Sequence, residues 1–168
     1  LVPLRDSIDT LVEIVQGAKD AMSEQRAEDI GLHVFGVGGK QVGLLSLLGV
    51  DTFDCSTHMQ TARYKKYLHP GTWAHHDLDN LSEYLGSEGS YPCNLPNCIL
   101  CGEDGVEYDT LLEELDTNLT YEERQERKKN GEYIKSDYYA LLARHNFEVY
   151  NEELRRVRTA IREGTLLE

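Results

Sequence analysis

The sequence predicts an α/β fold with parallel strands, followed by a segment that a metal ion and long helices hold together. In the first third of the chain, short apolar segments alternate with segments of helical periodicity. Three of the four cysteines lie close together in the middle of the chain, and the last third carries a long amphipathic pattern. Because strands that alternate with helices are normally parallel and joined by right-handed crossovers, the first part is assigned to the α/β class.

The predicted elements begin with a short strand over residues 1–4. Ser7 is the expected N-cap of a helix, because apolar residues then fall on one helical face as far as Met22. A polar linker over residues 23–31 leads to a second strand over residues 32–37. We expect this strand to be buried, since it is short, apolar and followed by glycines.

A short helix follows over residues 41–48, with Gly49 as the residue that ends it, and a third strand covers residues 50–55. Two strand–helix units cannot close a barrel, so on the residues alone they are either a piece of a barrel or half of an open sheet. Residues 56–106 have little periodicity, which indicates a loop-rich segment held by a metal.

Two helices are predicted in the last third of the chain. Thr120 and Glu123 form a capping-box pattern that opens a helix ending near Gly131. Residues 133–163 are typical of one long helix, or two in tandem, stopped by Gly164.

The balance of 17 basic and 30 acidic residues gives a net charge of −13, which argues against general coating of nucleic acid. Arg63, Lys65 and Lys66 remain a candidate basic patch, whereas the basic run over residues 124–129 is typical of a solvated helix. No apolar segment reaches the length of a membrane span, and no signal-peptide pattern is present, so a cytoplasmic protein is expected.

A glycine cluster over residues 36–39 follows the second strand. It is not a phosphate-binding P-loop, because Val34 stands where that motif needs glycine and Gln41 where it needs a hydroxyl. Either the glycines serve only a sharp turn, or a base or sugar packs against this strand end. The second reading fits the rule that sites in α/β folds gather at the carboxyl ends of strands.

Asp54 ends the third strand and is a candidate functional residue. A carboxylate is unfavourable in a core and useful at the mouth of a parallel strand. Asp51 lies three residues earlier and points to the opposite face, so the two do not form a cooperating pair.

The cysteines Cys93, Cys98 and Cys101 supply three thiolates, and tetrahedral zinc requires a fourth ligand. Clustered cysteines in a cytosolic chain indicate metal binding before disulfides, with three free thiols as the alternative. A site that joins this loop to a distant helix is structural rather than catalytic. Cys55 is expected to be a buried core thiol. The candidates for the fourth ligand include His69, His75, His76 and His145.

Taken in order, these motifs resemble those of tRNA-guanine transglycosylases, most closely the archaeosine type. The start of the chain resembles the end of that family's sixth barrel strand, and the next two strands resemble its seventh and eighth. The cysteine cluster resembles its zinc site, and the long helix resembles the one with its zinc histidine. The matching segments are residues 1–4, 33–38, 49–55, 62–63, 67–68, 91–93, 140–146, 153–158 and 160–164.

The resemblance implies the C-terminal portion of a (β/α)8 barrel in residues 1–56 and a zinc-binding helical subdomain in residues 57–168. It implies that Asp54 attacks the ribose C1′ and displaces guanine, and that a 7-deazaguanine base then displaces the aspartate. It implies structural zinc bound by Cys93, Cys98, Cys101 and His145. The implied substrate-binding residues are Leu1, Val2, Phe35, Gly36, Arg63 and Lys66.

The sequence departs from the family pattern at the metal site, because the first gap between cysteines is wider and residues 102–130 look inserted. These departures indicate a divergent paralogue, and one such branch acts on DNA instead of tRNA. The expected partners are therefore tRNA or DNA, a 7-deazaguanine base, the rest of the barrel from the same or another chain, and a second copy in a homodimer. The family's other catalytic aspartate lies on an earlier strand, so these residues alone should be inactive. The alternatives are a non-enzymatic zinc module that binds nucleic acid or a partner, such as a subunit of a split enzyme, and an unrelated α/β zinc protein.

Overall fold

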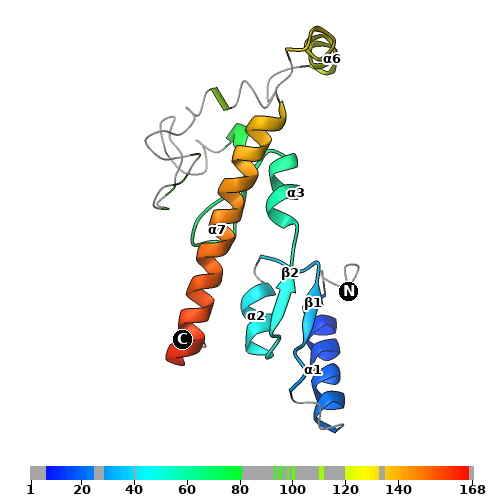
Figure 1. Ribbon diagram of the computed structural model, residues 1–168, viewed down its shortest axis with the longest axis vertical. Coiled ribbons are helices and arrows are strands. Elements are labelled where there is room, and N and C mark those ends of the chain that lie inside the picture. The colour runs from blue at the N-terminus through cyan, green and yellow to red at the C-terminus, as the bar shows by residue number, and fades with distance from the viewer. Residues whose placement is uncertain are drawn as a thin grey trace. The chain divides into compact units, whose positions relative to one another are not determined.

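The chain forms two compact units, which are described separately. The first comprises Leu1–Thr57 with Leu154–Glu168, and the second comprises His58–Glu153. The structure is a computed structural model (Figure 1). It describes residues 7–24, 29–39, 41–80, 93, 95, 98, 100, 110–111, 120–132 and 135–166. The predicted strand over residues 1–4 lies outside them.

The first unit is built from two helices, two parallel strands and the end of the long helix α7 (Lys135–Glu163), from Leu154 onward. Its elements are α1 (Ile8–Glu24), β1 (His33–Phe35), α2 (Gln41–Leu47) and β2 (Thr52–Asp54). The strands pair in register, with His33 opposite Thr52 and Phe35 opposite Asp54, and Figure 1 shows both arrows running in the same direction. The parallel α/β arrangement predicted from the sequence is thus confirmed for these strands. The core joins the helices to one face of the pair through Leu11, Val15, Val34, Val37, Leu45 and Val50.

The helix ends of this unit follow from local chemistry. Ser7 caps α1, because its hydroxyl accepts the Thr10 N–H at 3.4 Å and its carbonyl accepts the Leu11 N–H at 3.0 Å. The helix runs on to Glu24 and so takes in the start of the predicted linker. Gly49 has a φ of 74°, the left-handed conformation that ends α2 as predicted.

The strand predicted as buried over residues 32–37 is shorter and only half buried. Val34 is buried, whereas Phe35 is 67% exposed and His33 is also exposed. The prediction is wrong because Val34 points into the core with α1 and α2, whereas His33 and Phe35, as alternate residues of the strand, point the other way and are not buried by any described residue. The third strand is likewise confined to Thr52–Asp54, and Val50 before it belongs to the core.

The second unit mixes helices with a small antiparallel hairpin. Its elements are α3 (Thr57–Arg63), β3 (Lys66–Leu68), β4 (His75–Asp77), a short 3-10 turn (Leu78–Asn80), α6 (Tyr121–Asn130) and α7 (Lys135–Glu163), with α3 starting and α7 ending in the first unit. Tyr67 pairs with His76 in the hairpin. The core gathers residues from all parts of the unit: Ala62, Tyr67, Leu78, Cys98, Leu100, Leu111 and Leu142.

The prediction of an irregular segment after residue 56 is wrong for residues 57–80, which hold α3 and the hairpin. Tyr67 and Leu68 are fully buried, and the hairpin is closed by a hydrogen bond from the His69 N–H to the Ala74 carbonyl at 3.0 Å. Strands of three residues are too short to give a periodic signal in the sequence.

The two predicted C-terminal helices are confirmed. Thr120 and Glu123 form the reciprocal capping box of α6, and Gly131 ends it at a φ of 72°. The segment that allowed one helix or two is the single helix α7, which ends before Gly164. No helix in the described part of the chain is long and apolar enough to cross a membrane.

Candidate metal centre and catalytic strand

The second unit contains a compact group of side chains that could hold a metal ion. The ligand atoms of Cys93, Cys98 and His145 all lie within 4.8 Å of one another. Cys98 and His145 are buried, at 3% and 0% exposure, and His145 Nδ1 lies 3.2 Å from the Cys98 Sγ. Two sulfurs and an imidazole nitrogen are a donor set that suits zinc. The structure therefore brings together three of the four predicted ligands, and Cys101 lies outside the described residues.

The imidazole of His145 is held in its orientation by contacts on the side of the ring that faces away from the cysteines. Its Nε2 donates to the Leu68 carbonyl at 3.0 Å, and its ring stacks on Tyr67 with 4.2 Å between ring centroids. This contact leaves Nδ1 directed at the cysteines. A backbone carbonyl on the second nitrogen is the usual way in which a metal-binding histidine is held.

The electrostatics of the group depend on the balance of burial and sulfur contacts. Burial on its own would lower the pKa of His145. Hydrogen bonds to the Cys93 and Cys98 sulfurs, with the negative charge of these thiolates, outweigh burial and raise the pKa to about 9. The raised pKa therefore reflects how closely the two sulfurs face Nδ1 of His145.

Asn146 is a structural residue of this site that sequence reasoning missed. Its Oδ1 accepts the Leu68 N–H at 2.9 Å, and its Nδ2 donates to Thr61 Oγ1 and to the Lys66 carbonyl, both at 3.0 Å. Consecutive residues of α7 therefore bind both backbone groups of Leu68. Two adjacent polar residues on the apolar face of a long helix were the signal that could have revealed this contact.

The upstream histidines are not in the metal-ligand group that the described residues form. His69 Nδ1 lies 2.8 Å from the Pro70 carbonyl, inside the turn of the hairpin. Its ring meets that of His76 edge-on at 6.1 Å. His75 lies on β4, and burial, followed by nearby Lys66 and His76, lowers its pKa.

The first unit places a second set of polar side chains on the face of the strand pair opposite the core. Because register partners share a face, His33 and Phe35 lie beside Thr52 and Asp54, whereas Phe53 packs on the core side. The Asp54 side chain is 62% exposed. This face offers a carboxylate and an aromatic ring at the carboxyl ends of two parallel strands, with an imidazole two residues before the aromatic ring.

The carboxylate of Asp54 is held by the turn after β1. The Gly36 N–H donates to Asp54 Oδ1 at 3.0 Å and is also 3.0 Å from the Asp54 carbonyl, which accepts the Val37 N–H at 3.2 Å. Gly36 has a φ of 71°, which favours glycine. The glycine cluster therefore does serve a sharp turn, and the turn ends at the candidate nucleophile.

Two neighbours of Asp54 have structural roles. Asp51 Oδ2 accepts the Leu32 N–H at 2.7 Å and so fixes the start of β1. Cys55, predicted as a buried core thiol, is only partly buried, because it follows the strand end and faces Gly38. A Cβ atom at Gly38 would lie 2.9 Å from the Cys55 sulfur, so a side chain does not fit there.

The structure does not test the place of the remaining predicted substrate residues relative to Asp54. Arg63 ends α3 and Lys66 begins β3, where its Nζ lies 3.7 Å from Asp77 Oδ1. Both belong to the second unit, so their place beside Asp54 stays a prediction. Leu1 and Val2 lie outside the described residues.

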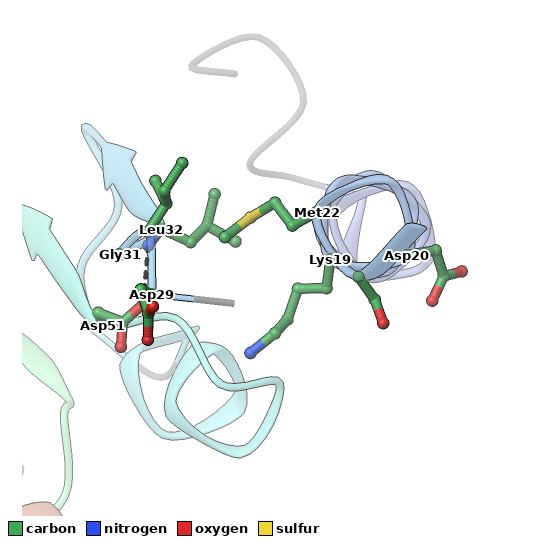
Figure 2. Close-up of a pocket in the computed structure, with 9 residues that line it drawn as sticks. Lys19, Asp20, Met22, Asp29, Gly31, Leu32 and Asp51 are labelled. Carbon is green, nitrogen blue, oxygen red and sulfur yellow. Dashed lines mark hydrogen bonds between the residues drawn. The ribbon is translucent and has the colours of Figure 1, made fainter. Parts of the chain in front are cut away.

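A pocket in the first unit lies at the other end of the strands (Figure 2). Lys19 and Met22 line it from the last turns of α1, and Asp51 lines it from the residue just before β2. The Lys19 ammonium already donates to the Gly49 carbonyl at 2.8 Å, and Asp51 to Leu32 is the dashed contact in the figure. Because chemistry in α/β folds gathers at the carboxyl ends of strands, we assign this pocket no function.

The two sites define an α/β protein with a carboxylate at the end of a parallel strand and a buried group of cysteine and histidine ligands. The chain belongs to the queuine tRNA-ribosyltransferase family, whose model matches residues 2–168. The resemblance to tRNA-guanine transglycosylases is thereby confirmed.

The curated relatives include several named tRNA-guanine(15) transglycosylase. The protein of Thermococcus onnurineus is 31% identical over 99% of this chain and 23% of its own length. That of Haloferax volcanii is 31% identical over 100% of this chain and 26% of its own length, and that of Pyrococcus abyssi is 32% identical over 93% and 20%. The chain thus spans about a quarter of the length of these relatives, or less. No solved structure gives a significant match.

Proposed function

We propose that this chain forms the last part of the barrel and the zinc subdomain of an enzyme that exchanges guanine in tRNA for a 7-deazaguanine base. Family membership supports this, and the observation that carries it is the position of Asp54. A carboxylate at the carboxyl end of a parallel strand, beside an exposed aromatic ring, is where a barrel enzyme of this kind needs its nucleophile.

In the proposed reaction, an oxygen of the Asp54 carboxylate attacks C1′ of the ribose. The bond from C1′ to the guanine nitrogen breaks, and guanine leaves with the electron pair and takes up a proton. The ring nitrogen of the incoming base then attacks C1′. The bond from C1′ to the Asp54 oxygen breaks, the carboxylate leaves, and the base gives up its ring proton. One difficult substitution becomes two easier ones, and no external energy source is needed.

The neighbours of Asp54 support these roles. The Gly36 N–H, 3.0 Å from Oδ1, orients the carboxylate before attack. Phe35, the register partner of Asp54, is 67% exposed and offers its ring to the face of a flipped base. Arg63 and Lys66 are proposed to hold phosphates, and the backbone of Leu1 and Val2 to read the base edge.

Structural zinc is proposed at Cys93, Cys98, Cys101 and His145. When bound, zinc contributes folding free energy to the subdomain. The residues of this chain prepare the site by burying His145 and by holding its Nε2 on the Leu68 carbonyl, so that Nδ1 faces the sulfurs. Closing the site joins the cysteine segment to α7 and to the hairpin at once.

The substrate is proposed to be tRNA, because the relatives carry the name tRNA-guanine(15) transglycosylase. The other catalytic aspartate is proposed to come from the rest of the barrel, in the same or a second polypeptide. We place the enzyme in the cytoplasm, and a homodimer is the expected assembly.

The test is a trapping assay with the complete enzyme, meaning this chain together with the rest of the family's length. We expect a denaturation-resistant adduct with tRNA, no adduct with DNA, and no adduct with Asp54→Asn. Asp51→Asn is the matched control, since it keeps an acceptor for the Leu32 N–H and should form the adduct normally. An adduct with DNA alone would assign the chain to the DNA-directed branch, and no base exchange on either would favour a non-enzymatic module.

A further inference from the structure

His33 has no role in the proposed function, yet its ring is held in place beside the nucleophile. Its Nδ1 lies 2.8 Å from Thr52 Oγ1, and its ring meets the Phe35 ring edge-on with 4.3 Å between centroids. These contacts direct Nε2 toward Asp54, whose Oδ1 lies 3.8 Å away. The side chain of His33 is 35% exposed, so burial does not explain its orientation.

The arrangement favours one tautomer of the imidazole. If Nδ1 donated to Thr52, Nε2 would turn a lone pair toward the carboxylate, which is unfavourable. If the Thr52 hydroxyl donates to Nδ1, Nε2 carries the proton and faces negative charge. The second arrangement satisfies Thr52 and Asp54 together, and it needs no charge on the imidazole.

The two oxygens of Asp54 are also not equivalent. Oδ1 accepts the Gly36 N–H and faces His33 Nε2. Among the residues that the structure describes, none donates a hydrogen bond to Oδ2. One oxygen is therefore held by the protein, and the other is available to react.

We propose that His33 is a positioning residue that holds Asp54 Oδ1, so that Oδ2 is the oxygen that bonds to C1′. The inference rests on the proposed function and deepens it. At 3.8 Å the contact is electrostatic, and a small rotation of either side chain brings it within hydrogen-bond distance. When the ester breaks in the second step, charge returns to the carboxylate, and the same N–H and Gly36 stabilise it.

The decisive comparison is between two amide replacements of His33 in the complete enzyme. The nitrogen of Gln reaches the place of Nε2, whereas that of Asn reaches only the place of Nδ1. We expect His33→Leu and His33→Asn to slow adduct formation with tRNA by roughly 10- to 100-fold, with KM changed less than about three-fold. His33→Gln should stay within about five-fold of the original rate.

Thr52 provides a second pair of variants that leaves His33 intact. Thr52→Val removes the hydroxyl that fixes Nδ1 and should slow adduct formation by about ten-fold, whereas Thr52→Ser keeps it and should change little. If all His33 and Thr52 variants keep the original rate while Asp54→Asn is inactive, His33 has no positioning role. If Asp54→Asn still forms the adduct, the proposed nucleophile itself is wrong.

A measurement that does not depend on activity completes the test. Nitrogen-15 NMR of the complete enzyme, with labelled histidine and assignment by substitution of His33, reports the tautomer of this ring directly. We expect the Nε2–H form for His33, and a shift toward the Nδ1–H form in Thr52→Val. Finding the Nδ1–H form in the unaltered chain would overturn the proposal.

Discussion

The two candidate sites differ in how completely this chain builds them. In the second unit, His145 is fully buried, and α7, the hairpin and the cysteine segment all supply contacts to the metal group. In the first unit, Asp54 is 62% exposed and lies on an open face of two strands. The comparison shows that the described residues of the second unit already enclose the candidate metal ligands, whereas the proposed nucleophile lies on a surface that the first unit leaves open.

The largest effect is expected from removing the imidazole at the metal group. His145→Ala should lose zinc and cost more than about 4 kcal/mol, because metal binding contributes to the folding of the unit. Elemental analysis and thermal unfolding with and without chelator measure both effects. His69→Ala is the matched control and should keep its zinc, and zinc loss there would move the fourth ligand to the hairpin.

The next largest effect on the free energy of unfolding is expected from a residue that supports the candidate metal ligands without being one of them. Asn146→Ala leaves the buried Leu68 N–H without its acceptor and should cost roughly 2–4 kcal/mol, summed over the lost hydrogen bonds. Denaturant unfolding of the zinc-loaded chain measures it. Arg144→Ala, which removes an exposed pair with Glu148 at 3.3 Å, should cost under about 0.5 kcal/mol. Equal costs for the two would contradict the assigned role of Asn146.

Two glycine substitutions in the first unit test whether the turn that holds Asp54 is strained. Gly36→Ala forces a side chain onto a φ of 71° and should cost about 1–2 kcal/mol, with slower adduct formation because its N–H orients Asp54. Gly43→Ala lies inside α2 with open space around it and should stabilise by about 0.5–1 kcal/mol. Chemical denaturation gives both values, and the same sign for both would show that the turn is unstrained.

The smallest effect is expected on tRNA binding, and it tests whether basic residues of the second unit contact the same substrate as Asp54 of the first. Charge reversal at Arg63 and Lys66 should weaken tRNA binding by about three- to ten-fold at moderate salt and flatten its salt dependence by about one contact per residue. Binding titrations at several salt concentrations measure this. Charge reversal of two basic residues in the Arg124–Lys129 run of α6 is the control and should leave tRNA binding unchanged. An equal loss of affinity in the control would contradict a specific role for Arg63 and Lys66.

Much of the fold could be predicted where the chemistry is local. The capping box at Thr120, the left-handed Gly49 and Gly131, and the single face of α7 all follow from neighbouring residues. The hairpin of residues 66–77 could not be predicted, because its strands are three residues long and are stabilised by contacts with α7, about 80 residues away.

The candidate sites divide in the same way. Asp54 and the three clustered cysteines were singled out because their residue types and positions carry chemistry on their own. His145 was one of several histidine candidates until the family resemblance pointed to it. His33 and Asn146 were missed because their roles exist only through partners across the fold, Thr52 and Leu68. The half-exposure of β1 was also missed, since an apolar segment does not reveal how many of its faces are covered.

The central claim is that Asp54 bonds covalently to the ribose during base exchange. The most direct measurement is peptide mapping by mass spectrometry of the complete enzyme, denatured during turnover with tRNA and digested. The account predicts a single adduct, on the peptide that contains Asp54, with the added mass of the nucleic acid fragment attached through C1′. An adduct on Asp51 or on any other residue, or none at all while base exchange proceeds, would contradict it.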